Sequence, residues 1–435
     1  MNSTFSAKDG LGGELVPPPD KSLTHRALLL SSIAEGRTLI HNPLDTGDCR
    51  STRRCIEELG VILKESIKPG ERLLEVSGAG LIGYREPAGV LDAGNSGTTI
   101  RLLSGLLAGL PIYAVISGDR SLAARPMGRV IEPLRQMGAC IAGRSDGRFA
   151  PLTFLPGDGL LTARSVCLEI PSAQVKSALL LAALKCSGTT IISGRIDSRD
   201  HTERLFQYLE LPLVREKEYL KLEPCSVIPA FEITIPGDIS SAAFFIAGAL
   251  ISGRELLIRH CGINPTRLGF LKVIRKMGAE AHILEVDVNC GEPVGTIQIK
   301  PAELKGVVIK KADIPDLIDE IPLIAVLALF ARGSTTVQGA GELRFKESDR
   351  LEAIARLVRA VGAELILDQD GFTIEGGQAL AGGIIDAGHD HRIAMAGAIL
   401  SAGVRDKIVV HGIEAAEVSF PDFISTFRAL GGEVE

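Results

Sequence analysis

The sequence predicts a mixed α/β protein of two globules, each built from three copies of one unit in which strands and helices alternate. Three observations predict this fold class: one unit recurs six times, its first helix is apolar on nearly every side, and a shorter echo marks where the chain passes between globules. The chain has 435 residues, which is ample for two domains with separate cores.

The repeated unit begins with an apolar helix, followed by a turn at Gly or a small polar residue and then by a strand. Its six copies read "HRALLLSSIAEGRTLIHN", "TTIRLLSGLLAGLPIYAVIS", "VKSALLLAALKCSGTTIISG", "SSAAFFIAGALISGRELLIRH", "IPLIAVLALFARGSTTVQG" and "HRIAMAGAILSAGVRDKIVVHG". They recur about every seventy-odd residues, which is longer than the roughly 20–50-residue periods of solenoids. The repeat therefore indicates globular units rather than a solenoid.

A second helix follows in each unit and ends in a weaker echo. Five copies read "CIEELGVIL", "LRQMGACIA", "IRKMGAEAHI", "LVRAVGAELIL" and "FRALGGEVE", whereas "LFQYLELPLV" lacks the glycine. The glycine is typical of a helix C-cap that precedes a strand. Each unit is therefore predicted to run strand, helix, strand, helix, strand.

The first helix of each unit is expected to be buried on all sides, because segments such as "ALLLAAL" and "AGAIL" have no polar face. Sheets covering three such helices would form one globule. A second echo, "ELVPPPDKS" and "EITIPGDISS", places Asp20 and Asp238 three repeats apart. We therefore expect one globule at 20–236 and a second formed by 1–19 with 237–435, with the ligand site in the cleft between them.

Composition excludes several classes of protein. The net charge is −6 without a basic block, which argues against binding of nucleic acid. None of the eight cysteines forms a C-x-x-C pair, so we expect reduced thiols in the cytoplasm and no zinc site. The apolar runs are shorter than the ~20 residues that span a bilayer, and no signal-peptide core is present at the N-terminus. We expect neither a nucleic-acid nor a membrane partner.

The segments that enter the buried helices are unusually polar. They read "DKSLTHR", "GNSGTTIR", "SAQVKS", "GDISSA", "ADIPDLIDE" and "GHDHR". Helix N-termini carry unpaired N–H groups and the positive end of the helix dipole, so they bind anions well. Each segment alone could be a helix cap or a solvated charged turn. Their recurrence at one position of the repeat favours an anion site.

Individual motifs leave alternatives open. Ser22 and Arg26 share a helix face, as do Lys346 and Arg350 in "RFKESDRLEAI", where a salt-bridged helix start is the plain alternative. "SRDHTER" is most simply a solvated, charged helix start. "GNSGTT" lacks the lysine of a phosphate-binding loop. A metal at "GHDHR" is disfavoured by the adjacent positive charge of Arg392.

Taken together, the motifs resemble the enolpyruvyl transferase family, and most closely its members that act on shikimate 3-phosphate. The resemblance covers nearly the whole chain and rests on "DKSLTHR", "LDAGNSGTTIRLL", "RPMGRV", "PSAQVKSALLLA", "SRDHTER", "IPDLIDE", "KESDR" and "DHRIAMA". It implies an inverse αβ-prism fold: two globules, each of three βαβαββ units with buried parallel helices, that close over the substrates.

The resemblance also implies the reaction. Such enzymes transfer the enolpyruvyl group of phosphoenolpyruvate to the 5-hydroxyl of shikimate 3-phosphate, and they release phosphate after addition and elimination through a tetrahedral intermediate. This is a step of chorismate and aromatic amino acid biosynthesis and the target of glyphosate. The chemistry needs an acid/base pair and electrostatic support, so neither a metal nor an organic cofactor is implied. We expect a monomer.

The resemblance assigns site residues. Shikimate 3-phosphate would be bound by Lys21, Ser22, Arg26, Ser172, Ala173, Gln174, Arg199, Asp316 and Lys346. Phosphoenolpyruvate would be bound by Lys21, Asn95, Gly97, Arg125, Gln174, Arg350 and Arg392. Two multiply charged anions can share a pocket only if several Lys and Arg side chains offset their repulsion. The first globule would bind mainly shikimate 3-phosphate, and the second would add phosphoenolpyruvate-binding and acid/base residues.

Three residues are the catalytic candidates. Asp316 is the expected base for the substrate hydroxyl, Glu347 is expected to exchange the proton at C3, and Lys21 could share either role. The sequence departs from the family at Val418 in "AEVSFPDF", where many members carry Lys. The segment around Val418 therefore lacks the lysine that would contact phosphoenolpyruvate in many members of the family.

Two other functions remain open at this point. A transferase that acts on UDP-N-acetylglucosamine usually has a reactive Cys, which is absent from "GDRSLAARPMG". A non-catalytic anion-binding protein on the same scaffold is the other alternative, and the presence of Lys21, Asp316 and Glu347 together argues against it.

Overall fold

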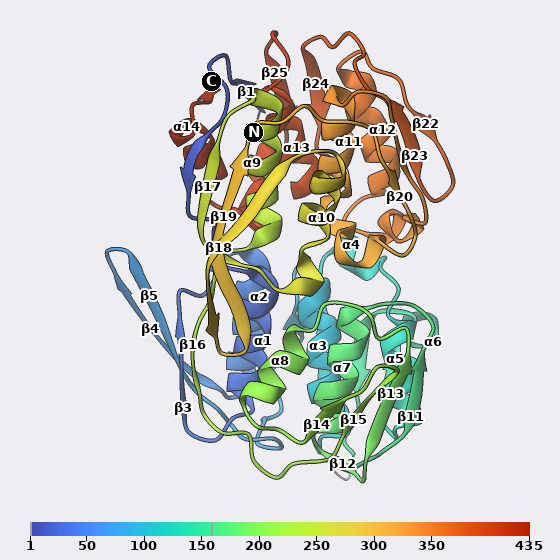
Figure 1. The fold of residues 1–435 in the computed structure, drawn as a ribbon. Coiled ribbons are helices and arrows are strands. Elements are labelled where there is room, and N and C mark those ends of the chain that lie inside the picture. The colour runs from blue at the N-terminus through green and yellow to red at the C-terminus, as the bar shows by residue number, and fades with distance from the viewer. Residues whose placement is uncertain (1, 158–159) are drawn as a thin grey trace. The chain divides into compact units, whose positions relative to one another are not determined.

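The chain forms two compact units, shown in the computed structural model of Figure 1, which describes residues 2–157 and 160–435. We call them the N-terminal unit (Pro19–Ile235 and Val288–Glu292) and the C-terminal unit (Met1–Pro18, Pro236–Asp287 and Pro293–Glu435). Each contains three four-stranded sheets and three buried helices, so the predicted mixed α/β fold of six repeated units is confirmed.

The three sheets of the N-terminal unit share one mixed topology. In each, an edge strand pairs in parallel with its neighbour, and the two further strands pair antiparallel. In spatial order, the strands of the first sheet are β16 (Glu232–Thr234), β3 (Arg37–His41), β5 (Glu71–Ser77) and β4 (Ile62–Lys68), and those of the second are β6 (Leu91–Asp92), β7 (Ala114–Ser117), β9 (Phe149–Phe154) and β8 (Ile141–Gly143). The third sheet consists of β11 (Ser165–Leu168), β13 (Thr190–Gly194), β15 (Tyr219–Leu222) and β14 (Leu213–Arg215). The strands β10 (Leu161–Thr162) and β12 (Cys186–Ser187) form a separate pair.

The helices of the N-terminal unit fall into two kinds. Those buried on nearly every side are α1 (Lys21–Ser32), α3 (Gly97–Leu107) and α7 (Ala173–Ala183). Those with one exposed face are α2 (Gly47–Glu58), α5 (Gly128–Gln136) and α8 (His201–Tyr208), and the short segments are α4 (Arg120–Ala123) and α6 (Arg144–Gly147). The helix α3 packs against both α1 and α7, so the buried helices meet in one core.

The sheets of the C-terminal unit have the same spatial order. They are β24 (Gly383–Asp386), β25 (Ile408–His411), β1 (Asn2–Ser6) and β26 (Glu433–Val434); β2 (Gly13–Leu15), β17 (Leu256–Gly262), β19 (Glu292–Lys300) and β18 (Glu280–Asn289); and β20 (Val308–Ile309), β21 (Ser334–Val337), β23 (Phe372–Glu375) and β22 (Ile366–Leu367). The first strand of each set pairs in parallel with the second.

The buried helices of the C-terminal unit are α9 (Ile239–Ser252), α11 (Ile321–Phe330) and α13 (His391–Leu400), which contact one another and lie side by side in Figure 1. The remaining helices are α10 (Gly269–Lys276), α12 (Arg350–Ala360) and α14 (Phe423–Ala429), with the 3₁₀ turns η1 (Pro265–Arg267), η2 (Ile314–Asp316), η3 (Ile318–Glu320), η4 (Gly341–Phe345) and η5 (Ile413–Val418). Among the described residues, no helix is long and apolar enough to span a bilayer.

The chain changes unit directly after a strand at two places. β2 pairs with β17 of the C-terminal unit, but the helix that follows it, α1, belongs to the N-terminal unit. Conversely, β16 completes the sheet of β3, and the next helix, α9, belongs to the C-terminal unit. The segment Val288–Glu292 is also part of the N-terminal unit, although the chain on either side of it belongs to the other unit.

Most of the buried helices begin with a side-chain cap. The first turns of α1, α3, α7, α9 and α13 donate N–H groups to the side chains of Asp20, Ser96, Ser172, Asp238 and Asp390. A capping oxygen satisfies a backbone donor that would otherwise be unpaired at the helix start. The helix α11 has no such cap and follows the turns η2 and η3 instead.

A residue with positive φ follows the second helix of each of the six repeats. Its φ lies between 80° and 108° at Gly60, Gly138, Gly278, Gly362 and Gly431, as expected for the repeated glycine. The sixth copy has Glu210 there, with φ 56°. The repeat therefore demands this backbone geometry even where the side chain disfavours it, at a cost of about 1 kcal/mol.

We expect Glu210→Gly to raise the free energy of unfolding by about 0.5–1 kcal/mol, because glycine adopts positive φ without the Cβ clash. The urea midpoint should increase at an unchanged slope. Gly138→Ala is the matched control, since φ is 98° and no atom lies within 4 Å of the added Cβ. Gly138→Ala should lower the urea midpoint. If both variants shifted the midpoint in the same direction, residue 210 would not be strained by its positive φ.

A buried lysine makes stability depend on pH. Lys185 is buried, its Nζ donates to the carbonyl of Leu106, and burial lowers its pKa to about 7. In the unfolded chain the pKa of lysine is about 10.4, so between these values the unfolded state binds more protons and stability rises with pH. Lys185→Met should remove a slope of up to about 1.4 kcal/mol per pH unit from urea titrations between pH 7 and 10. Parallel curves for both proteins would contradict this.

Candidate active site

The predicted site residues of the N-terminal unit lie mainly where its buried helices begin. Lys21 and Ser22 open α1, Gly97 opens α3, and Ala173 opens α7 directly after its cap Ser172. The first N–H groups of a helix have no partner within the helix and point out of its end. The three helix starts therefore offer backbone donors as well as side chains to an anion.

Arg26 lies one turn deeper in α1 and is buried. Its guanidinium donates to Ser22 O (2.8 Å), to Thr202 Oγ1 (2.8 Å) and to Ser177 Oγ (3.0 Å). Burial lowers the pKa of Arg26 to about 10, so the group stays charged at neutral pH. Sequence reasoning missed Ser177 and Thr202, which lie in "SAQVKS" and "SRDHTER" and which fix the direction of this cation.

Lys21 is paired with a carboxylate from the neighbouring helix. Its Nζ lies 3.1 Å from Oδ2 of Asp48, in the first turn of α2, and both side chains are mostly buried. Sequence reasoning missed Asp48, because a carboxylate in the first turn of a helix is ordinarily explained by the helix dipole.

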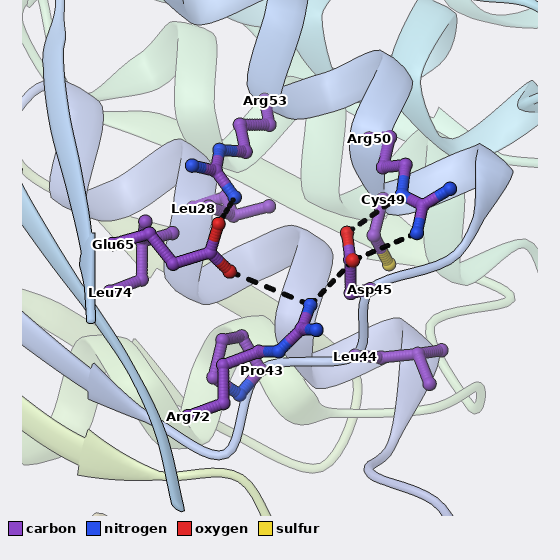
Figure 2. A pocket seen from close by; sticks show the side chains of 10 residues that line it. All are labelled: Leu28, Pro43, Leu44, Asp45, Cys49, Arg50, Arg53, Glu65, Arg72 and Leu74. Atoms are coloured by element: carbon purple, nitrogen blue, oxygen red, sulfur yellow. Dashed lines mark hydrogen bonds and ion pairs between the residues drawn. The ribbon is translucent and has the colours of Figure 1, made fainter. Parts of the chain in front are cut away.

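A network of ion pairs connects the start of α2 to the strands β4 and β5. Figure 2 shows Asp45 accepting two hydrogen bonds from Arg50, both 2.9 Å, while Arg72 of β5 bridges Asp45 and Glu65. Arg53 of α2 pairs with Glu65 at 2.9 Å. These groups line a small pocket beside α2, but each of them is paired with another charged group of the network, and none of the predicted site residues lines it. We interpret the network as a structural one that holds α2 against the β4–β5 hairpin.

Two guanidinium groups flank Gly97. Nη1 of Arg101 and Nη1 of Arg125 lie 2.7 Å and 3.4 Å from the position that a Cβ at residue 97 would occupy. Arg125 donates to Asn95 Oδ1 at 2.5 Å, and Arg101 donates to Gln174 Oε1 at 2.7 Å. The structure therefore brings together Asn95, Gly97, Arg125 and Gln174. Arg101, four residues after Gly97 on the same helix face, was missed.

The motif "SRDHTER" does not form a solvated helix start, as its simplest interpretation predicted. Asp200, His201 and Glu203 are buried. The reason is that α8 packs against α1, and its polar side chains bond inside the unit. Ser198, directly before the half-buried Arg199, is buried and its hydroxyl has no hydrogen-bond partner among the described residues. An unpaired buried hydroxyl beside a cation is a candidate donor to an anion.

In the C-terminal unit, the predicted cations converge on Asp319. Lys346 Nζ and Arg350 Nη1 lie 3.5 Å and 3.3 Å from Asp319 Oδ1. Arg392 Nη2 lies 3.8 Å from Oδ2, and its Nη1 donates to the backbone carbonyl of Asp319 at 3.0 Å. Glu347 Oε2 accepts from Arg350 Nη2 at 2.5 Å. Four predicted residues are therefore grouped around a carboxylate that sequence reasoning did not select.

Asp316 lies outside this group. Its Oδ2 pairs with Lys272 of α10 at 2.9 Å, with both side chains at least one third exposed, and no contact among the described residues joins it to Lys346, Arg350 or Arg392. "IPDLIDE" folds as two separate 3₁₀ turns, and Leu317 between them has φ −143°. The break turns Asp316 and Asp319 to different neighbours, so Asp319 is paired with the cations while Asp316 keeps a partly exposed carboxylate.

Arg350 is the most deeply buried cation of the group. Its Nε donates to Asp390 Oδ2 at 2.8 Å, and both side chains are at most 1% exposed. Burial alone would lower the pKa of Arg350, but Asp390, Glu347 and Asp319 together outweigh burial and raise it. The arginine therefore remains charged at every working pH and holds Asp319 and the acid/base candidate Glu347 beside one buried cation.

Arg392 stands between two carboxylates. Its Nη1 lies 3.7 Å from Oε1 of Glu320, which also accepts a hydrogen bond from Ser240 of α9. Val418 lies at the end of η5 and supplies no charge. The C-terminal unit thus presents cations and adjacent carboxylates, an arrangement that can bind anions and move protons.

Comparison with known proteins agrees with this arrangement. The family model described as "EPSP synthase (3-phosphoshikimate 1-carboxyvinyltransferase)" matches residues 6–427. A protein of Bacillus cereus (strain G9842) named "3-phosphoshikimate 1-carboxyvinyltransferase" is 43% identical over 423 residues, covering 97% of each chain. One of the same name from Desulfitobacterium hafniense (strain DSM 10664 / DCB-2) is 43% identical and covers 96% of this chain and 95% of its own.

Solved structures agree as well. An EPSP synthase from Acinetobacter baumannii superimposes with a TM-score of 0.87 at 36% identity and covers 100% of this chain and 99% of its own. The enolpyruvyl transferase NikO from Streptomyces tendae shares the fold, with a TM-score of 0.79 at 15% identity and coverage of 100% and 98%. On the extent of these matches and on the residues assembled in each unit, the chain belongs to the EPSP synthase family.

Proposed function

We propose that this enzyme transfers the enolpyruvyl group of phosphoenolpyruvate to the 5-hydroxyl of shikimate 3-phosphate and releases inorganic phosphate. The observation that carries the proposal is the convergence of Lys346, Arg350 and Arg392 on Asp319. It groups the cations that a reaction between two anionic substrates requires. Membership in the family supports the same reaction.

Shikimate 3-phosphate is bound mainly by the N-terminal unit in this proposal. Its ligands are Ser22, Arg26, Ser172, Ala173, Gln174 and Arg199, with Asp316 and Lys346 from the C-terminal unit. We add Ser198, since its buried hydroxyl has no partner among the described residues. Hydroxyl groups, a helix start and arginines together suit a phosphate.

Phosphoenolpyruvate is bound by residues of both units. They are Lys21, Asn95, Gly97, Arg125 and Gln174 of the N-terminal unit, with Arg350 and Arg392 of the C-terminal unit. The two guanidinium groups beside Gly97 make that helix start strongly cationic. A side chain at residue 97 would compete for this space, so glycine is needed there.

The reaction proceeds by addition and elimination. Asp316 accepts the proton of the 5-hydroxyl as the hydroxyl oxygen bonds to C2 of phosphoenolpyruvate, and C3 receives a proton from Glu347 or Lys21. The tetrahedral intermediate then loses phosphate from C2 and returns a proton from C3 to the group that donated it, which restores the double bond. Arg350 and Arg392 offset the negative charge throughout. These side chains supply all the groups that the chemistry needs, so the proposal includes no cofactor.

We further propose that the enzyme works as a monomer in the cytoplasm. The eight cysteines are free thiols, and six of them are at least half-buried, which suits a reducing compartment. Sedimentation equilibrium should give the molecular mass of one chain.

Two other functions are disfavoured. The matching relatives are named for shikimate 3-phosphate rather than for a UDP-sugar, and the 118–128 loop lacks a cysteine. A non-catalytic anion-binding protein would bind both substrates without turnover. Phosphorus NMR of the protein with shikimate 3-phosphate and phosphoenolpyruvate separates the three possibilities, and release of phosphate only with the UDP-sugar would refute the proposal.

Asp316→Asn should reduce kcat about 10²–10⁴-fold, because it removes the proton acceptor while keeping the shape of the side chain. The measurement is phosphate release at saturating concentrations of both substrates. Asp313→Asn is the matched control from the same motif. It weakens only a partly exposed pair with Lys276, so both kcat and stability should stay close to those of the wild type. A larger loss of kcat in Asp313→Asn than in Asp316→Asn would contradict the proposal.

Gly97→Ala should weaken inhibition by glyphosate about tenfold or more. The added Cβ lies 2.7 Å from Arg101 Nη1, so the guanidinium must move into the space beside phosphoenolpyruvate. Steady-state kinetics should show a smaller rise in the KM for phosphoenolpyruvate and an unchanged KM for shikimate 3-phosphate. Unchanged inhibition would show that this space is not used by the inhibitor.

A further inference from the structure

An ion pair is buried in the N-terminal unit beneath the start of α7. Lys176 of α7 is fully buried, Glu203 of α8 is almost so, and Nζ lies 2.6 Å from Oε1. Taking two charges out of water is costly, and replacing such a pair by apolar side chains of similar volume often leaves a protein as stable or more so. Stability alone therefore does not explain why charges occupy this place.

The ammonium group has three donors, and the structure uses all of them. Besides Glu203, Lys176 Nζ donates to the carbonyl oxygens of Ile196 (2.9 Å) and Ser198 (3.2 Å). Burial lowers the pKa of Lys176, and the adjacent carboxylate of Glu203 limits that fall. A neutral amine has only two hydrogens, so Glu203 preserves the third donor by keeping the amine protonated.

The two carbonyls belong to the segment that joins β13 to α8. This segment, Ile196–Arg199, carries Ser198 and Arg199, both assigned above to the phosphate of the substrate. Lys176 itself lies four residues after Ser172, on the same helix face, and its N–H donates to the carbonyl of Ser172 at 3.0 Å. One cation therefore ties the start of α7 to the Ile196–Arg199 segment.

We propose that Lys176 is a positioning residue for shikimate 3-phosphate: it holds the Ile196–Arg199 segment against the start of α7, so that Ser198, Arg199 and Ser172 are set for the phosphate before the substrate arrives. Glu203 is the counter-ion that keeps Lys176 charged. This inference rests on the proposed function and deepens it. No role in binding phosphoenolpyruvate follows from these contacts.

The test compares Lys176→Met with the double variant Lys176→Met/Glu203→Met. The single change leaves the buried Glu203 with only its 3.4 Å pair to Arg215 and should lower Tm strongly, whereas the double change removes both buried charges and should recover most of Tm. Both variants should raise the KM for shikimate 3-phosphate about tenfold or more, since neither can hold the two carbonyls. The KM for phosphoenolpyruvate should change less than about threefold.

Lys185→Met is the matched control, because Lys185 is another buried lysine, just beyond the opposite end of α7, and its Nζ bonds to Leu106 O. It should alter stability without changing either KM. A double variant that recovers both Tm and the KM for shikimate 3-phosphate would overturn the inference, as would equal rises of the two KM values.

Calorimetric titration with shikimate 3-phosphate alone separates this inference from the proposed function. The wild type should bind it, and the double variant should bind about tenfold more weakly. Binding of equal strength to both proteins would refute the role of Lys176 while leaving the proposed function intact. A wild type that neither binds shikimate 3-phosphate nor releases phosphate would refute the proposed function itself.

Discussion

Burial of a helix on all sides is the constraint on which the rest of this structure depends. From Ile321 to Leu329 every residue of α11 is buried, and α9 and α13 are buried over almost their whole length. Such a helix cannot present polar side chains along its middle without partners, so polar groups collect at its start, where unpaired N–H groups also lie. The repeat multiplies this effect and supplies each unit with three polar helix starts for one set of anions.

The fold could be predicted from the sequence because most of its signals are local. Apolar helices, capping residues such as Asp20 and Ser172, and the glycine after each second helix recur at fixed places in the repeat. Strand partners are not local. β16 pairs with β3 from far along the chain, β1 pairs with β25 across most of it, and no periodicity reveals such pairs. Glu210 shows the limit of a residue signal, since the left-handed turn persists without its glycine.

The candidate site was predictable to the extent that it consists of cations at helix starts. Lys346, Arg350 and Arg392 do converge, and they meet at Asp319, whereas Asp316 pairs with Lys272. Both lie in one short motif, and only the break between two 3₁₀ turns decides which of them faces the cations. The partners of Arg26 were missed for a similar reason, since hydrogen bonds between helices depend on packing that a single sequence does not display.

Internal carboxylates make a strongly cationic site compatible with a folded protein. Lys21 has Asp48, Arg350 has Asp390 and Glu347, and Lys176 has Glu203. Bringing like charges together without counter-ions would cost several kcal/mol in a low-dielectric interior. A pair such as Arg350–Asp390, where both groups are buried, holds a fixed geometry, whereas partly exposed groups such as Lys346 and Glu347 can exchange their partners for substrate. Affinity for an anionic substrate is then the difference between the contacts that the substrate makes and the internal contacts that it displaces.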